Sequence, residues 1–325
     1  MSSPEFELIR ALGPFLDGDS GAVPLGVDDD AAVVLVGSTP VAVAVDAMVD
    51  GVHFDRAVSS FEDVGFKALA VNVSDLAAIG ARPVAAVIAL QRPPGLDDAD
   101  VIALYRGLRE AADRWDVALV GGDTVGSPVL SVSVTVLGGL PGAAALRRDG
   151  AQPGDIVLVV GPLGLAAAGL ALFRAGASQL LEAHPELLAA HRRPEALPAV
   201  GAALATGGAS AAIDVSDGLG RDLGHVADQS GVHIRIESAR LAIHPGVAAA
   251  AEHLDLDPLE LVVGGGDDYA LVACVPPDRH AQVAAAVRAV GREAHVIGHV
   301  ERGSGVRLLA GDGRTRDASQ LGFQH

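Results

Sequence analysis

The chain has 325 residues, enough for two domains of ordinary size, and half of its residues are hydrophobic. Its formal net charge is −18, which argues against a nucleic acid or an anionic membrane as the main partner. Lys67 is the only lysine and Cys274 the only cysteine, so the P-loop, the lysine of the protein-kinase fold, an intrachain disulfide and a multi-cysteine metal site are all excluded.

The amino terminus lacks the basic and apolar regions of a secretory signal. No uninterrupted apolar run reaches the length that spans a membrane. We therefore expect a soluble, cytoplasmic protein.

The first 140 residues mix helices and strands. Ser59 precedes Glu62 by three residues, the spacing of a capping box, and predicts a helix that runs to about Ile79. Further helices are predicted over residues 4–12 and 97–115, and strands over 31–36, 41–45, 84–90, 117–120 and 129–136. The last strand alternates with Ser and Thr, so one of its faces is either wetter or paired with another chain.

Small turn residues at positions 138–142 form the best candidate linker, so we expect one domain over 1–140 and a second over 141–325. In the second, strands are predicted over 156–160, 211–215, 232–236, 269–275, 295–300 and 306–309. Helices are predicted over 163–175, 177–191, 195–205, 245–252 and 277–290. The pattern is that of an α/β protein.

Acidic residues stand at the ends of five apolar runs. The segments are 28–30 (Asp-Asp-Asp), 46–54 (Asp46 to Phe54), 121–124 (Gly-Gly-Asp-Thr), 214–218 (Asp-Val-Ser-Asp-Gly) and 264–269 (Gly-Gly-Gly-Asp-Asp-Tyr). On the predicted helix after Ser59, Asn72 and Asp75 share an otherwise apolar face, where they need either polar partners or a metal.

Several of these features, and also Tyr105 and the pair Arg147-Arg148, have a plain structural interpretation. The Asp triplet alone is more often a solvated turn, His53 more often a structural histidine, and Tyr105 a core residue. Ser216 or Asp217 is a fair candidate for a helix cap. The pair Arg147-Arg148 is either a phosphate site or a surface salt bridge.

Short acidic side chains at strand ends, in a chain with one cysteine, favour Mg²⁺ over zinc, because Mg²⁺ prefers oxygen ligands and zinc prefers histidine and cysteine. Several Asp residues around phosphates indicate phosphoryl transfer or other ATP-driven chemistry. Asp-rich loops also occur in phosphohydrolases and calcium modules, although the regular calcium loop is absent here.

Taken together, the motifs resemble those of thiamine-monophosphate kinase, in order and over nearly the whole chain. The matching segments are 27–32, 46–54, 71–81 (Val-Asn-Val-Ser-Asp-Leu-Ala-Ala-Ile-Gly-Ala), 121–124 and 214–219. That family shares a superfamily with aminoimidazole ribonucleotide synthetase (the PurM-like fold), hydrogenase maturation protein E and selenophosphate synthetase. The resemblance implies a two-domain α/β fold with an ATP-binding amino-terminal domain that dimerises through its sheet.

The reaction implied by the resemblance moves the γ-phosphate of ATP directly onto thiamine monophosphate, with Mg²⁺ and without a side-chain nucleophile. The implied metal ligands are Asp29, Asp46, Asp75, Asp123, Asp214 and Asp217, of which Asp123 and Asp217 are catalytic as ligands. The implied ATP contacts are Tyr105, Gly122, Asp123, Arg148 and Ser216, and the implied thiamine-phosphate contacts are His53, Asp267 and Phe323.

The sequence departs from the family pattern in two places. Ala44 and Val45 stand where a hydroxyl pair is usual, and Asp267 stands where Glu is usual. These departures leave open a non-catalytic protein that binds thiamine phosphate or nucleotide, or another ATP-using member of the superfamily. The absence of a carboxy-terminal cysteine argues against the hydrogenase maturation protein, and the absence of a reactive amino-terminal cysteine with its lysine argues against selenophosphate synthetase.

Overall fold

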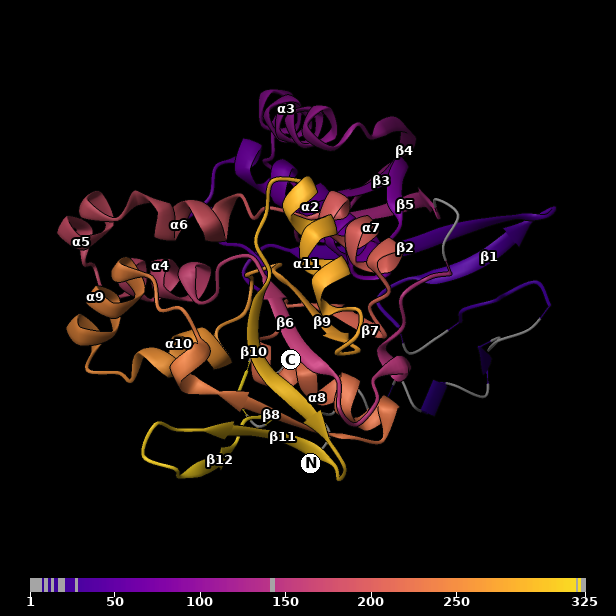
Figure 1. The fold of residues 1–325 in the computed structure, drawn as a ribbon. Coiled ribbons are helices and arrows are strands. Elements are labelled where there is room, and N and C mark those ends of the chain that lie inside the picture. Colours follow the sequence, from indigo (N-terminus) through magenta and orange to yellow (C-terminus); the bar gives the residue numbers. More distant parts are fainter. Residues whose placement is uncertain are drawn as a thin grey trace.

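The computed structural model describes residues 8, 11–12, 15–16, 21–26, 29–140, 144–319 and 321–322. Within these ranges no helix has both the length and the apolar character needed to cross a membrane. Two sheets, one from each half of the chain, carry helices on their faces (Figure 1). The helix predicted over 4–12 lies mostly outside the described residues.

The amino-terminal sheet has five strands in the order β1-β2-β5-β3-β4. Their bounds are Ala32–Val36 for β1, Thr39–Val49 for β2, Arg82–Arg92 for β3, Ala118–Gly126 for β4 and Ser131–Gly139 for β5. Only β3 and β4 run parallel; the other neighbours are antiparallel. Helices α2 (Phe61–Ala78) and α3 (Asp98–Trp115) belong to the same hydrophobic core.

The opposite face of this sheet leaves apolar side chains in solvent. Val45 of β2, Thr135 of β5 and Val87 of β3 lie in one row across the sheet. Val45 is 61% exposed and Val120 of β4 is 62% exposed. The alternating polar strand predicted over 129–136 is β5, at the centre of the sheet.

The carboxy-terminal sheet has seven strands in the order β12-β11-β8-β10-β6-β9-β7. The bounds are β6 Ile156–Val160, β7 Ala211–Asp214, β8 His233–Glu237, β9 Leu271–Val275, β10 His295–Glu301, β11 Gly305–Leu309 and β12 Thr315–Asp317. The helices are α4 Leu165–Arg174, α5 Ser178–Ala183, α6 Pro185–Arg192, α7 Pro198–Gly207, α8 Leu219–Ser230, α9 Pro245–Leu254, α10 Pro258–Gly264 and α11 His280–Ala289. Short 3-10 turns lie at Arg148–Gly150 (η2) and Ser238–Arg240 (η3).

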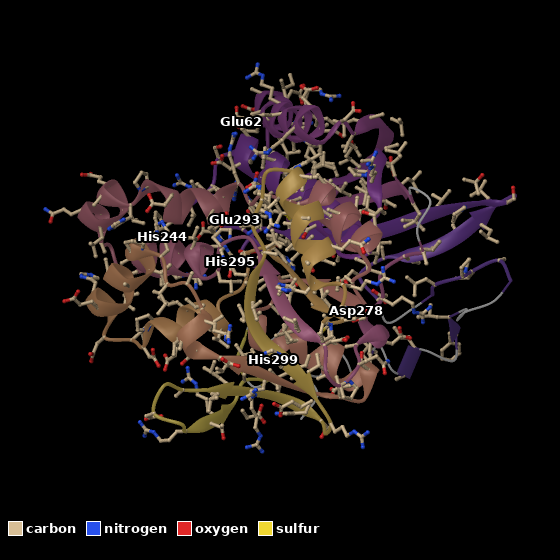
Figure 2. All side chains as sticks on the ribbon, in the orientation of Figure 1. Glu62, His244, Asp278, Glu293, His295 and His299 are labelled. Carbon is tan, nitrogen blue, oxygen red and sulfur yellow. The ribbon has the colours of Figure 1, made fainter. Side chains whose placement is uncertain are left out.

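This sheet lies between two layers of helices. Side chains of α7 and α11 pack on one face with Leu158 and Leu271, whereas α8 and α10 pack on the other with Val157 and Cys274. Cys274 is buried, as expected for a small core residue. Asp278, just before α11, and His295, at the start of β10, are among the exposed polar side chains (Figure 2).

The two halves meet where α7 crosses α2. A Cβ on Gly201 of α7 would lie 1.9 Å from the carbonyl oxygen of Ala77 in α2, so only glycine permits this separation. Ala77 and Ala78 also share a hydrophobic cluster with Leu158 and Leu204 of the carboxy-terminal half. Helix α2 therefore contributes to the packing of both halves.

Several predicted boundaries were wrong. Strands β2 and β4 run on to Val49 and Gly126, so Asp46 and Asp123 lie within strands and not at their ends. The cap of α2 is Ser60, not Ser59: its hydroxyl accepts the Asp63 N–H and the Asp63 carboxylate accepts the Ser60 N–H, both at 3.1 Å. The helix predicted over 177–191 is divided into α5 and α6. Pro185 begins α6 because proline lacks the amide hydrogen that a continuous helix would need there.

Candidate active site

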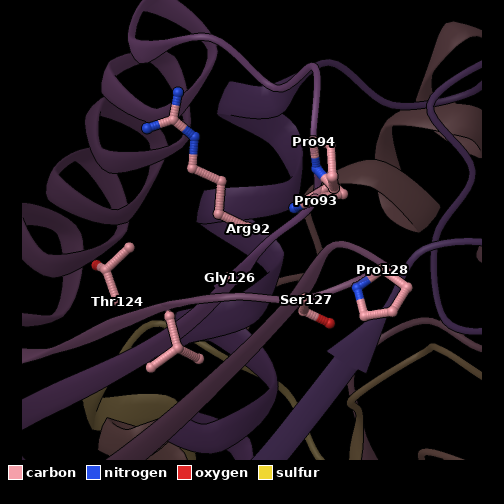
Figure 3. A pocket seen from close by; sticks show the side chains of 8 residues that line it. Arg92, Pro93, Pro94, Thr124, Gly126, Ser127 and Pro128 are labelled. Carbon is pink, nitrogen blue, oxygen red and sulfur yellow. The ribbon is translucent and has the colours of Figure 1, made fainter.

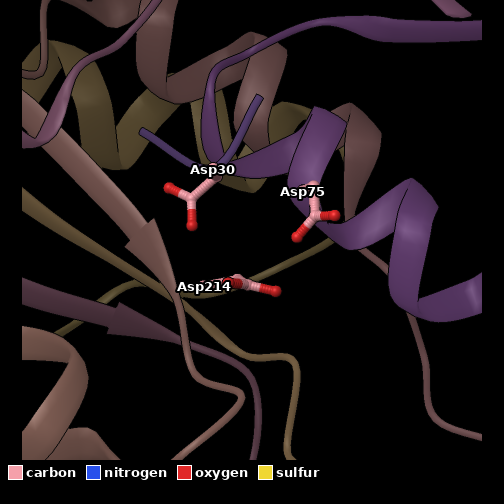
Figure 4. Close-up of side chains that lie close together, drawn as sticks. All are labelled: Asp30, Asp75 and Asp214. Atoms are coloured by element: carbon pink, nitrogen blue, oxygen red, sulfur yellow. The ribbon is translucent and has the colours of Figure 1, made fainter. Parts of the chain in front are cut away.

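Three carboxylates from distant parts of the sequence meet between the two halves of the chain. Asp30 lies just before β1, Asp75 lies in α2 and Asp214 ends β7 (Figure 4). Each offers an oxygen, and these oxygens all lie within 4.8 Å of one another. We call Asp30, Asp75 and Asp214 the acid cluster.

The acid cluster has more negative charge than its partners balance. Burial, together with the nearby charge of Asp30, raises the pKa of Asp214 to about 7. Burial and the charge of Asp46 raise the pKa of Asp75 well above its usual range. The Ser74 hydroxyl donates to Asp214 at 2.5 Å. The raised pKa values show that these carboxylates lack enough positive charge around them. A divalent cation bound by their converging oxygens would supply that charge.

Arg148 is the cation that the protein itself supplies to the cluster. Its guanidinium donates to Asp30 at 2.5 Å, and its backbone N–H donates to Asp29 at 3.1 Å. The two arginines of the pair differ, because Arg147 forms an exposed ion pair with Asp149 at 2.9 Å. Asp29 therefore binds the backbone at η2, while Asp30 joins the cluster.

Asp46 approaches the cluster from β2. Its N–H donates to the Asn72 side-chain oxygen at 2.8 Å, and the Asn72 amide donates to the Ala68 carbonyl at 2.9 Å. Asn72 is fully buried. The polar face predicted on this helix is confirmed as an interior face, with Asn72 satisfied by backbone groups and Asp75 placed among the acids.

The turn over residues 214–218, here called the acidic turn, connects β7 to α8. The buried carboxylate of Asp222 accepts the N–H groups of Ser216, Asp217 and Gly218 at 3.0, 3.1 and 3.1 Å. Neither Ser216 nor Asp217 caps α8, whose N-cap is Gly218 without a side-chain bond. The Asp217 carboxylate lies 3.2 Å from Arg221. Asp222 lies outside the segment 214–219 that matches the family motif, and it was not among the predicted site residues.

A separate cavity of about 430 Å³ lies against the edge strand β4. Tyr105, Gly122 and Asp123 line it, together with Ile88, Leu119, Gly121 and Thr124. Three of the predicted ATP contacts are thus together. Gly122 is level with Asp46 in the sheet register, but β5 and β3 lie between β4 and β2. Three interstrand spacings separate the two positions by about 14 Å.

Two of the predicted substrate contacts, His53 and Asp267, are described, and both are engaged within the protein. The Val49 N–H donates to His53 Nδ1 at 3.2 Å, within the turn after β2. The Asp267 carboxylate lies 2.7 Å from Lys67 Nζ and 2.9 Å from His191 Nδ1. The Lys67 ammonium and a hydrogen bond from the His191 ring hold the pKa of Asp267 well below its usual range despite burial. Phe323 lies outside the described residues.

A larger cavity of about 660 Å³ occurs at the far end of β3 and β4. It is lined by Arg92, Pro93, Pro94, Thr124, Val125, Gly126, Ser127 and Pro128 (Figure 3). None of these residues belongs to the acid cluster, and the lining holds no carboxylate. This cavity is therefore not the candidate active site.

Sequence comparisons agree over most of the chain. The AIR synthase related protein family matches by its N-terminal domain over residues 28–140 and by its C-terminal domain over 152–311. Thiamine-monophosphate kinase of Caulobacter vibrioides is 37% identical over 328 residues, covering 99% of this chain and 90% of its own. The chain belongs to the thiamine-monophosphate kinase family.

Other family members support the assignment. The kinase of Mycobacterium tuberculosis is 44% identical over 253 residues, which covers 78% of this chain and 75% of its own. The structure described as AaThiL complexed with AMPPCP and TMP has a TM-score of 0.82 and 31% identity, and the match covers 96% of this chain and 94% of that one. The two-domain fold implied by the sequence motifs is confirmed.

Among the residues that the family motifs pointed to, the structure brings some together and keeps others apart. Asp75 and Asp214 lie in the acid cluster, whereas Asp123 lies on the edge strand. Asp30 was not predicted, yet of the two described residues of the Asp triplet, Asp29 and Asp30, it is the one in the acid cluster. His191 was also missed, because nothing in the helical pattern around it marks a polar contact.

Proposed function

We propose that this chain transfers the γ-phosphoryl group of ATP to thiamine monophosphate, using Mg²⁺ held at the acid cluster. The acid cluster is the observation that carries the proposal, because buried converging carboxylates need a cation. Family membership supports the substrates, since the related kinases carry that name and AaThiL was solved with AMPPCP and TMP.

Asp30, Asp75 and Asp214 would hold the metal. We assign its wider surroundings to Asp46, whose charge acts on Asp75, and to Asp217, which lies three residues after Asp214. Asp29 remains a predicted ligand, although its carboxylate already accepts the backbone N–H groups of Asp30 and Arg148. Mg²⁺ bound there would neutralise phosphate charge and orient the reacting oxygens. Arg148 already neutralises Asp30, which lowers the cost of gathering these acids before metal arrives.

We propose that the nucleotide lies along the cavity at β4, against Tyr105 and Gly122. Asp123 is too far from Asp46 in the same chain for both to bind one metal ion, as the strand order requires. A second copy that covers the exposed face around Val45 would bury its apolar side chains and could supply Asp123 to this site. Both observations favour a homodimer formed through the amino-terminal sheet.

The remaining assignments follow the family pattern and are proposals. His53, Asp267 and Phe323 would face thiamine monophosphate, and Ser216 would contact ATP. Asp267 can serve in this way only if a substrate group is added to, or exchanged for, its bonds with Lys67 and His191. We also propose a domain boundary between residues 140 and 141 and a cytoplasmic location.

The test is to incubate the protein with Mg²⁺, ATP and thiamine monophosphate and to measure thiamine diphosphate and ADP. We expect equal amounts of both products. Binding of both substrates with no diphosphate formed would reject the kinase and support a non-catalytic binding protein. Ala44 and Val45 stand just before Asp46, where the family pattern has hydroxyl side chains. A non-catalytic binding protein is therefore the alternative that this assay has to exclude.

A further inference from the structure

The only lysine of the chain lies in the interior. Lys67 belongs to α2 and is 4% exposed. Its Nζ donates to Asp267 Oδ2 at 2.7 Å, and Asp267 lies in the segment that joins α10 to β9 in the carboxy-terminal half. A buried ammonium group is very unfavourable without a partner. Lys67 therefore ties the helix that carries Asp75 to a loop of the other half.

The Asp267 carboxylate is fully engaged by side chains from three segments. His191, at the end of α6, lies 2.9 Å from the oxygen that Lys67 contacts. The hydroxyl of Tyr269 donates to the other oxygen at 3.1 Å. Tyr269 itself is buried with the hydrophobic core of the amino-terminal half. The charged group of Asp267 is thus a junction between the two halves of the chain.

The backbone around this junction is held in an unusual conformation. Asp267 has a φ of 66° and Tyr269 a φ of 51°, both in the left-handed region that residues other than glycine rarely adopt. Such conformations persist where the surroundings fix them. Here the surroundings are the side chains that bind the Asp267 carboxylate and the hydrophobic core that packs around Tyr269.

The same segment forms a brace behind the acidic turn. The Asp267 N–H donates to the Ser216 carbonyl and the Tyr269 N–H donates to the Val215 carbonyl, each at 2.8 Å. A Cβ on Gly266 would lie 2.5 Å from the Ser216 carbonyl oxygen, so the two backbones are in contact. A shift of this segment would move the turn that carries the proposed metal ligands.

We propose that Lys67 is a positioning residue for the metal site. By fixing Asp267 it holds residues 267–269 against the acidic turn, and thereby keeps Asp214 and Asp217 aligned with Asp75 across the two halves. Its effect on the metal rests on the proposed function, whereas its effect on the segment does not. Lys67 does not touch the reacting groups in this arrangement.

The direct test is amide hydrogen exchange at Asp267 and Tyr269 in the full-length protein. Lys67→Met keeps most of the side-chain stem and removes the charge. We expect exchange of both amides to become at least about tenfold faster, and Lys67→Arg to restore part of the protection. The matched control is Arg193→Met, because Arg193 also joins the two halves, through ion pairs with Asp63 and Glu110 at 2.5 and 2.7 Å. It should leave these two amides as protected as in the wild type.

A second readout follows the metal with Mn²⁺ as the probe, titrated without nucleotide or thiamine monophosphate. We expect the Mn²⁺ dissociation constant to rise at least about tenfold in Lys67→Met and to stay unchanged in Arg193→Met. Equal losses in both variants would overturn the proposal, since that would indicate general destabilisation.

Unchanged exchange in Lys67→Met would overturn it even if the protein is not a kinase. If Lys67→Met fails to fold, the double variant Lys67→Met, Asp267→Asn removes both charges together. Fast exchange at residues 267 and 269 in this variant is expected, and wild-type protection would overturn the proposal.

Discussion

Replacing Asp214 with asparagine should stabilise the metal-free protein while it abolishes phosphoryl transfer. Asp214 is only 3% exposed, and burial with the charge of Asp30 raises its pKa to about 7. Asparagine has nearly the same shape, and its amide oxygen can still accept the hydroxyl of Ser74. The substitution therefore removes the uncompensated charge and little else.

The magnitude follows from the titration. The pKa of this carboxyl rises from 3.8 in the unfolded chain to about 7 in the folded protein. Below pH 3.8 the group does not affect the free energy of unfolding, and as the pH rises from there towards about 7 it lowers that free energy. Each pH unit between the two values costs about 1.4 kcal/mol, so the wild type loses about 4 kcal/mol near neutral pH. Asparagine avoids that loss. The gain should fall to about 2 kcal/mol near pH 5.

The assay is urea unfolding in EDTA at two pH values, repeated with excess Mg²⁺. In Mg²⁺ the order should reverse, because the wild type alone gains the free energy of metal binding. Asp155→Asn is the matched control: Asp155 is equally buried, but it accepts bonds from the Gln152 N–H and the Ser210 hydroxyl outside the acid cluster. It should lose stability. An Asp214→Asn protein no more stable than the wild type in EDTA near neutral pH would refute the reasoning.

Three further predictions concern catalysis, assembly and packing. Asp217→Asn should lower the rate of thiamine diphosphate formation by at least about a hundredfold with an unchanged circular dichroism spectrum, and near-normal turnover would remove Asp217 from the metal site. Val120→Asp should convert a dimer into a monomer in sedimentation velocity, whereas Val290→Asp, at another exposed valine, should not. Gly201→Ala should cost about 1–3 kcal/mol in urea unfolding, and Gly311→Ala, where a Cβ meets nothing within 4 Å, should cost little.

Helical and strand periodicity was enough to predict most elements and their order along the chain. It failed at boundaries where neighbouring residues offer the same chemistry. Ser59 and Ser60 can both start a capping box, and only the position of the Asp63 carboxylate decides between them. Pro185 was a clear break signal that the longer apolar pattern outweighed.

Side-chain direction in the site could not be predicted from spacing. Asp29 and Asp30 are identical residues in one triplet, and their roles differ because the Arg148 backbone, far along the chain, occupies Asp29. Lys67 was noticeable only for being unique, since its partner lies 200 positions away. A contact between the two halves produces no repeating pattern in the sequence of either half, so periodicity does not reveal it.

The three amides of the acidic turn, which face the Asp222 carboxylate, bear on how inhibitors should be designed for this family member. A helix start is normally attractive to sulfate or phosphate. Here an internal carboxylate already uses those donors. Anionic mimics that rely on backbone amides alone would have to compete with a tethered carboxylate. Compounds with a metal-chelating group would instead bind through the Mg²⁺ proposed at the acid cluster, so screening buffers for them should contain Mg²⁺.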